Sequence, residues 1–227
     1  LAITAAAVDP LVRVVILAAS GPVFCAGHDL KELTHGRKES DKGREYFTKI
    51  MLQCSSFMQA IVNNPKPVIA EVTGIATAAG CQLVASCDLA YAEEKALFST
   101  PGVNIGLFCS TPMVALSRNV TNKHALEMLL TGDLVSAHRA AEIGLINAVT
   151  EADDLTTKVM EVAMKIAAKS SATVAIGKRA FYEQCEMSLP DAYIFGAEVM
   201  VGNMLTQDAQ EGINAFIEKR TPKWSDQ

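Results

Sequence analysis

The chain has 227 residues, half of them hydrophobic, which suffices for one large domain or for one domain with a small appendage. Its 20 basic and 25 acidic residues give a formal charge of −5. This balance argues against a nucleic acid or an anionic membrane surface as the partner, because such partners are bound through an excess of basic residues.

The first part of the chain predicts one buried strand between short helices. Residues 1–9 are rich in alanine and predict a helix. Residues 12–20 are a β-branched run that ends at Ser-Gly-Pro, and they predict a buried strand. Asp29 is suited to be the N-cap of a helix that begins with LKEL. The charged residues 34–45 predict a mobile loop or a frayed helix.

Strands and helices then alternate, and helices dominate the last third. The pattern predicts a helix over 47–62, strands over 67–72, 88–94 and 96–99, a helix of small residues over 77–87, a loop over 100–106, and helical stretches over 112–130, 136–143, 152–187 and 190–219. This order predicts an α/β core followed by a helical C-terminal part.

The six cysteines are dispersed, with no CxxC pair and no Cys/His cluster of zinc-site spacing, so no metal is expected. They indicate reduced core residues in a cytosolic or organellar compartment. We expect the cytoplasm if the source is bacterial and the mitochondrial matrix if it is eukaryotic. No apolar run reaches the roughly 18 residues that span a membrane. Because the chain begins with Leu1 and not with Met, we expect further residues upstream of it.

Two predicted turns each present backbone N–H donors at the start of a helix. The strand at 12–19 leads into CAGHDL, and the strand at 67–72 leads into GIATAAGCQL. Backbone N–H groups that begin a helix are unsatisfied and carry partial positive charge, so two converging ones can hold an ester or thioester oxygen. The alternative is that both turns are ordinary strand-to-helix connections. The chain lacks GxGxxG, P-loop and GxSxG motifs, which argues against nucleotide binding and an α/β-hydrolase.

Four stretches in this order resemble the enoyl-CoA hydratase/isomerase, or crotonase, superfamily. They are VRVVILAASGPVFCAGHDLKEL, KPVIAEVTGIATAAGCQLVASCDLAYAEEKALFSTPGVNIGL, ALEMLLTGDLVSAHRAAEIGLINAV and QDAQEGINAFIEKRTPKW. The resemblance implies a spiral of ββα units over residues 1–150, without the family's first β-hairpin. It also implies a helical C-terminal region, residues 151–227, that forms trimers or hexamers. The implied activity is that of a hydratase or isomerase of fatty-acid metabolism.

The resemblance implies an acyl-CoA as substrate or ligand and no further cofactor. The thioester oxygen is expected between the backbone N–H groups of His28 and Ala79, the oxyanion hole. The residues implied to bind CoA or the substrate are Cys25, Ala26, Asp29, Lys31, Lys66, Phe216 and Lys219. Of these, Phe216 and Lys219 are expected to reach CoA bound mainly to a neighbouring subunit, and Asp29 also keeps its role as a helix cap.

The chain departs from the family at both catalytic glutamates. Family hydratases carry one in GGGCEL and one in PExxLG, where this chain reads AAGCQL and PGVNIG, with Gln82 and Gly102 at those places. A glutamine is no general base at neutral pH, and a glycine has no side chain, so glutamate-dependent hydration is not expected. The polar residues left near the acyl end are His28, Gln82, Asn104, Cys109, Ser110 and Thr111.

Three functions follow from this mixture of kept and lost features. The first is an enzyme that stabilises a thioester enolate or oxyanion and moves protons through water, His28 or the substrate. The second is a non-catalytic, regulatory or sequestering acyl-CoA-binding protein. The third is a structural subunit of a mixed oligomer. Lys31, Lys66 and Lys219 favour the first two.

Overall fold

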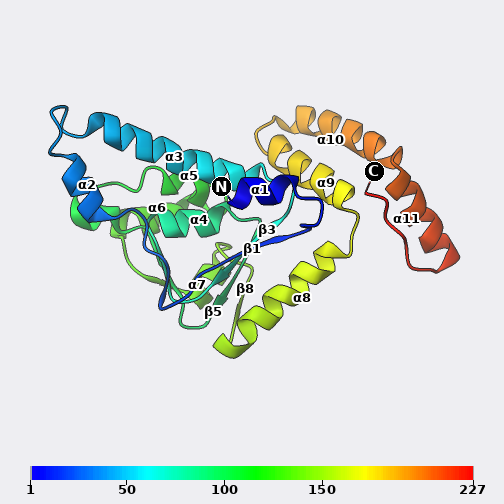
Figure 1. Ribbon diagram of the computed structural model, residues 1–227, viewed down its shortest axis with the longest axis horizontal. Coiled ribbons are helices and arrows are strands. Elements are labelled where there is room, and N and C mark those ends of the chain that lie inside the picture. Colours follow the sequence, from blue (N-terminus) through cyan, green and yellow to red (C-terminus); the bar gives the residue numbers. More distant parts are fainter. Residues whose placement is uncertain (1, 227) are drawn as a thin grey trace. The chain divides into compact units, whose positions relative to one another are not determined.

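The computed structural model describes residues 2–226, and its mixed α/β fold is the one that the sequence predicts (Figure 1). The helices are α1 (Ala2–Val8), α2 (Leu30–Gly36), α3 (Arg44–Val62), α4 (Ala79–Ser86), α5 (Pro112–Leu116), α6 (Asn122–Thr131), α7 (Ala137–Glu142), α8 (Leu155–Ala167), α9 (Ser171–Gln184), α10 (Leu189–Met204) and α11 (Gln207–Glu218), with the 3-10 helices η1 (Pro101–Ile105) and η2 (Ala152–Asp154). The strands are β1 (Val15–Ala18), β2 (Val23–Cys25), β3 (Val68–Val72), β4 (Ile75–Thr77), β5 (Leu89–Glu93), β6 (Leu97–Ser99), β7 (Val135–Ser136) and β8 (Ala148–Thr150).

The strands form two sheets. One has the order β1-β3-β5-β8, and β3, β5 and β8 pair in parallel. The other has the order β2-β4-β6-β7, in which β7 alone is antiparallel to its neighbour. Val68, Ile69 and Ala70 of β3 are fully buried, which explains why this strand reads as an unbroken apolar run. Because β2 and β4 are parallel neighbours, the turns that follow them begin at the same edge of the sheet.

Helix α4 lies close to the sheet, and almost all its residues are buried. It contacts β2, β4 and α3, and Figure 1 shows α3 and α4 on the same side of the strands. Gly80 in its first turn permits this close packing. A Cβ at Gly80 would lie 1.9 Å from the carbonyl oxygen of Cys25, which is inside van der Waals contact. The small residues of α4 therefore fix the end of β2 against the start of this helix.

Several predicted elements are confirmed, and others differ. The N-terminal helix, the strands over 12–20, 67–72, 88–94 and 96–99 and the helices over 47–62 and 77–87 are all present. The sequence missed β2, β4, β7 and β8, whose two or three residues are too few to show an alternating pattern. The predicted loop at 100–106 is largely η1, whose proline fits the first turn of a helix.

The charged stretch and the long helical stretches also differ in detail. Within 34–45, α2 ends at Gly36 and α3 begins at Arg44, with turns between them. The side chain of Asp41 accepts hydrogen bonds from the backbone N–H groups of Gly43 and Glu45, which orders the start of α3. The helical stretch predicted over 112–130 is two helices, α5 and α6, and the stretch predicted over 152–187 contains α8 and α9.

The described residues group into two compact units. Ile16–Val62 and Val68–Met160 form one, which contains most of both sheets, and residues 2–15, 63–67 and 161–226 form the other. The division at residue 150 expected from the sequence stays a prediction, as does trimerisation through the C-terminal helices. None of the helices within residues 2–226 is both long and apolar enough to cross a membrane.

In the second unit, Asp208 fastens the C-terminal segment to α11. Asp208 is 2% exposed, and its carboxylate accepts hydrogen bonds from Ser225 N at 2.7 Å, Ser225 Oγ at 2.8 Å and Asp226 N at 3.0 Å. Burial raises the pKa of Asp208, but the hydrogen bonds from Ser170, Ser225 and Asp226 outweigh it and hold the pKa below its usual value.

Because the folded-state pKa of Asp208 lies below its unfolded value, this carboxylate stabilises the fold above about pH 4, and the contribution is lost as the pH falls further. We expect Asp208→Asn to lower the free energy of unfolding by about 1–3 kcal/mol at pH 7. Urea denaturation at pH 7, 5 and 3.5 should show the difference between wild type and variant shrinking at the lowest pH. The exposed Asp153→Asn is the control, and an equal effect of both variants at pH 7 contradicts the prediction.

Candidate functional site

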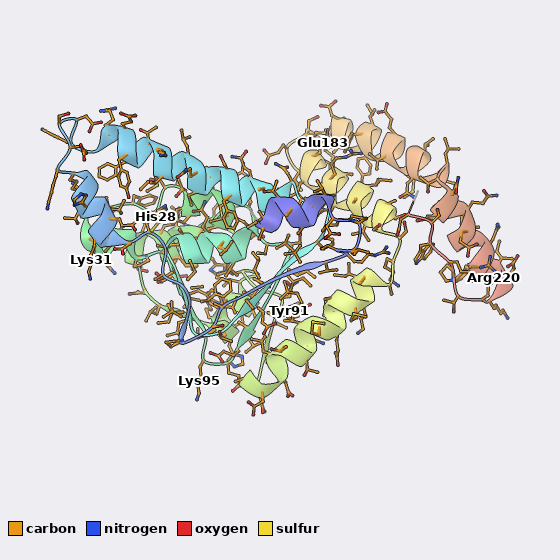
Figure 2. The ribbon with its side chains drawn as sticks, in the orientation of Figure 1. His28, Lys31, Tyr91, Lys95, Glu183 and Arg220 are labelled. Carbon is orange, nitrogen blue, oxygen red and sulfur yellow. The ribbon has the colours of Figure 1, made fainter. Side chains whose placement is uncertain are left out.

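The first turn of the candidate site joins β2 to α2. Gly27 has a φ of +87°, which places it in the left-handed region that favours glycine. Asp29 caps α2 as predicted, since its Oδ1 accepts a hydrogen bond from Lys31 N at 2.7 Å. Figure 2 shows His28 before α2 and Lys31 on its first turn. Among residues 2–226, the backbone N–H of His28 has no hydrogen-bond acceptor.

The second turn joins β4 to α4 and has an unusual backbone. Ala78, the residue before α4, has a φ of +53° and a ψ of −118°, a conformation that L-residues rarely adopt. Its own N–H donates to Ser99 O at 3.0 Å, which ties the turn to β6. The next N–H, that of Ala79, begins α4 and finds no acceptor in the described part of the chain. Strain of this kind collects at functional sites, where the surrounding structure maintains it.

The two turns lie against each other. A Cβ at Gly27 would be 3.1 Å from the backbone nitrogen of Ala79 and 3.1 Å from Ala78 Cβ. The N–H groups of His28 and Ala79 therefore belong to adjoining turns, held together by the pairing of β2 with β4 and by the packing of Gly80 on Cys25. Both donors are thus unpaired and lie on adjoining turns, and their expected role as an oxyanion hole stays a prediction.

Gln82 lies one helical turn after Ala79 on α4. Its side chain is 5% exposed, and Oε1 accepts a hydrogen bond from Cys54 Sγ at 3.9 Å, across the contact between α3 and α4. Burial, and then the neighbouring Cys25, raise the pKa of the Cys54 thiol, so the thiol stays neutral and acts as a donor at neutral pH. No local sequence pattern indicates this contact, because Cys54 lies on a separate helix.

Gly102 lies in η1 and is buried against the segment that follows it. A Cβ here would be 2.8 Å from Leu107 O, 3.0 Å from Cys109 Sγ and 3.2 Å from Cys109 N. Burial raises the pKa of the Cys109 thiol above its usual value, which argues against a nucleophilic thiolate. A side chain at position 102 would require the backbone of residues 107–109 to move. The chain therefore has no carboxylate at Gly102 and little space for one.

The other polar candidates lie on η1 and on the segment between η1 and α5. Asn104 lies against Gly132, where a Cβ would be 3.0 Å from Asn104 Nδ2. Ser110 Oγ donates to Phe108 O at 3.3 Å, and Thr111 directly precedes α5. Cys25 is half-buried at the end of β2, whereas Ala26 is exposed. The structure thus brings His28, Ala79, Gln82 and Gly102 into the same compact unit, together with Cys25, Ala26, Asp29 and Lys31.

The remaining CoA-binding candidates belong to the other compact unit. Lys66 lies between Pro65 and Pro67, and its carbonyl oxygen accepts a hydrogen bond from Lys178 Nζ at 3.1 Å. Phe216 on α11 is 86% exposed, and Lys219 ends that helix with a φ of +55°. Their roles toward CoA stay predictions. Within residues 2–226, no three His, Cys, Asp or Glu side chains are grouped so as to hold a metal ion.

Residues 2–227 match the family model described as enoyl-CoA hydratase/isomerase. The chain is 52% identical to mouse "enoyl-CoA hydratase domain-containing protein 3, mitochondrial" over 213 residues, which cover 94% of this chain and 69% of the relative. The human protein of the same name is 51% identical over 213 residues, which cover 94% of this chain and 69% of that relative.

Solved structures agree with this result. The crystal structure of an enoyl-CoA hydratase from Mycobacterium smegmatis matches with a TM-score of 0.93 and 52% identity, over 98% of this chain and 85% of that one. That of human enoyl-CoA hydratase domain-containing protein 3 matches with a TM-score of 0.90 and 48% identity, over 98% and 88%. The family match spans the unpaired N–H groups of both turns, and the chain belongs to the enoyl-CoA hydratase/isomerase family.

Proposed function

We propose that this protein binds acyl-CoA thioesters and holds the thioester oxygen between the backbone N–H groups of His28 and Ala79. The observation that carries the proposal is the pair of unpaired donors on two adjoining turns. An acyl oxygen that accepts both hydrogen bonds satisfies groups that are otherwise without a partner. Family membership supports a CoA thioester as the ligand.

The same two donors favour an enolate or a tetrahedral oxyanion over the neutral thioester. Negative charge on the acyl oxygen strengthens both hydrogen bonds, and a single preorganised donor of this kind contributes about 3 kcal/mol in enzymes. The positive end of the helix dipole of α4 adds to this effect at Ala79. The backbone alone therefore stabilises the negative charge that develops on the acyl oxygen, and no side chain is needed for this step.

The two positions that we infer for the family glutamates carry no general acid or general base in this chain. Gln82 takes up no proton near neutral pH, and Gly102 has no side chain. Proton transfer in a catalysed reaction then falls to water, to the His28 imidazole or to a group of the substrate. Isomerisation, decarboxylation and thioester hydrolysis remain candidate reactions, each beginning at a polarised thioester.

We expect crotonyl-CoA to bind but to be hydrated at a rate far below that of a glutamate-dependent hydratase. Two missing acid or base groups, each contributing about a hundredfold or more, account for the loss. Calorimetric binding and the loss of the enoyl thioester absorbance measure the two quantities separately. Turnover within about tenfold of an ordinary hydratase, assayed in parallel, contradicts this expectation because one lost group already costs more.

Gln82 and Gly102 equally favour a second function, that of a non-catalytic acyl-CoA-binding or regulatory protein. Incubation with a panel of acyl-CoAs, followed by mass spectrometry of the products, distinguishes the two. A new product for any thioester supports the enzyme, whereas binding of several thioesters without turnover supports the non-catalytic protein. Failure to bind any of them contradicts both and leaves a structural subunit.

The proposal extends to assembly and compartment. Several large apolar side chains of the C-terminal helices are exposed, which supports a homotrimer or a hexamer made through this region; among them are Tyr193, Met200, Met204, Phe216 and Ile217. In a eukaryotic source the mitochondrial relatives support the mitochondrial matrix. Sedimentation analysis tests the first point, and imaging of the full-length protein tests the second.

A further inference from the structure

The turn that carries the Ala79 N–H depends on a strained residue. Ala78 has a φ of +53° and a ψ of −118°, close to the first central position of a type II′ turn, which glycine normally occupies. A left-handed backbone is unfavourable for an L-residue, so Ala78 relaxes unless its neighbours hold it. The peptide that joins Ala78 to Ala79 includes the Ala79 N–H, so the conformation of Ala78 sets the direction of this donor.

Backbone hydrogen bonds hold the peptide on each side of Ala78. Its N–H donates to Ser99 O at 3.0 Å, and its carbonyl oxygen accepts from Gln82 N, within α4, at 3.1 Å. While α4 stays in place, a change of Ala78 to a negative φ requires the peptide between Thr77 and Ala78 to rotate, because φ is the rotation about the bond to the nitrogen. This rotation breaks the hydrogen bond to Ser99. The contact with Ser99 is therefore the one that opposes relaxation of the turn.

A pair of hydroxyl groups reinforces this contact. Thr77 and Ser99 are partners in register at the ends of the parallel strands β4 and β6, and Thr77 Oγ1 and Ser99 Oγ share a hydrogen bond of 2.8 Å. Ser99 is 2% exposed and Thr77 is half-buried, so water does not readily replace either partner. Ser99 thus holds two neighbouring residues of the turn, Thr77 through its hydroxyl group and Ala78 through its carbonyl oxygen.

We infer that Thr77 and Ser99 are positioning residues for the oxyanion hole, whose hydroxyl pair keeps Ala78 left-handed and the Ala79 N–H directed at the thioester oxygen. This inference rests on the proposed function. Neither hydroxyl group is assigned a contact with the substrate, since both act through the backbone of Ala78. A single neutral hydrogen bond contributes no more than the strain of one left-handed residue costs, so the Ser99 carbonyl alone does not hold the turn in one conformation.

The test uses the full chain and butyryl-CoA that carries carbon-13 at the thioester carbonyl. Hydrogen bonds to the carbonyl oxygen polarise the carbonyl group and move its carbon resonance downfield, so the displacement on binding reports on the two donors. Thr77→Val keeps the shape of the side chain and removes the hydroxyl group. We expect it to reduce the displacement and to weaken binding by about fivefold, the effect of one hydrogen bond. Adding Ala78→Gly should restore both, because glycine adopts a positive φ without strain.

Thr156→Val is the matched control. Thr156 Oγ1 donates to Glu71 Oε1 at 2.6 Å, between α8 and β3 of the same compact unit, neither of which carries the turn. Both valine variants should lose stability in thermal unfolding, and only Thr77→Val should change the carbonyl resonance. Thr77→Ser keeps the hydroxyl group and should retain the wild-type resonance. Ser99→Ala removes the same hydrogen bond from the other side, and it gives the same reading should Thr77→Val fold poorly.

The possible outcomes separate the inference from the proposed function. If wild type does not bind butyryl-CoA, or binds it without a downfield displacement, the proposed function itself is wrong. If wild type shows the displacement and Thr77→Val and Ser99→Ala both keep it, the inference is overturned and the hydroxyl pair only joins two strands. An equal change in Thr156→Val, or no recovery on adding Ala78→Gly, also overturns the inference, because the effect then does not pass through Ala78.

Discussion

Replacing Gly27 with alanine is expected to weaken acyl-CoA binding by at least about thirtyfold, the combined effect of two lost hydrogen bonds. The added Cβ would lie 3.1 Å from Ala79 N, the donor to which we assign the thioester oxygen. Gly27 also has a φ of +87°, so any Cβ shifts the turn that carries the His28 N–H. Calorimetric titration with butyryl-CoA measures the loss.

Gly21→Ala is the matched control for this substitution. Gly21 has a φ of +97°, so alanine there brings a similar backbone strain, but a Cβ would meet no atom within 4 Å. Both variants should lose about 1–2 kcal/mol of stability from the left-handed backbone, and only Gly27→Ala should lose affinity. Equal binding by the two variants means that the thioester oxygen does not lie between these turns.

The sequence predicted the two turns more accurately than the strands that carry them. Both predicted turns are present, and in the structure Gly27 and Gly80 lie where the backbone segments approach closely. The predicted strands over 12–20 and 67–72 are present, but the strands that lead into the turns, β2 and β4, were missed. Three-residue strands gain their stability from pairing with each other, and this pairing leaves almost no trace in the local sequence.

Other features of the site depend on contacts between distant segments. The left-handed Ala78 could not be predicted, because alanine has no local preference for that conformation and the turn is held by Ser99. The contact of Cys54 with Gln82 joins residues 28 positions apart on different helices. By contrast, the Asp29 cap of α2 was predicted correctly, because capping depends on residues within one turn.

The packing around Gly102 leaves no space for a side chain at that position. Leu107 O and Cys109 occupy the space that a side chain there would need, so a glutamate cannot be introduced without moving residues 107–109. Gln82→Glu requires no comparable rearrangement, since glutamine and glutamate have nearly the same shape. A glutamate at position 82 therefore requires only a change of side-chain atoms, whereas one at position 102 also requires a change of backbone packing.

Gly80→Ala is expected to lower the free energy of unfolding by about 3 kcal/mol, because overpacking against backbone offers little room for relaxation. The Cβ would lie 1.9 Å from Cys25 O, 2.7 Å from Cys25 C and 2.8 Å from Cys25 Cβ. Relief requires β2 to separate from α4, and this movement also separates the His28 and Ala79 donors. Thermal unfolding and butyryl-CoA titration should therefore both show a loss, with the melting temperature falling by about 6–12 °C.

Gly177→Ala on α9 isolates this steric effect from helix propensity. Both glycines lie within helices, but a Cβ at Gly177 would meet nothing within 4 Å. Alanine there should raise stability by up to about 1 kcal/mol, the ordinary gain over glycine in a helix. Opposite signs for the two variants show that the contact with Cys25 outweighs propensity at Gly80. A stabilised Gly80→Ala variant with full acyl-CoA affinity instead means that β2 can move away from α4 without disturbing the donors, and it contradicts the prediction.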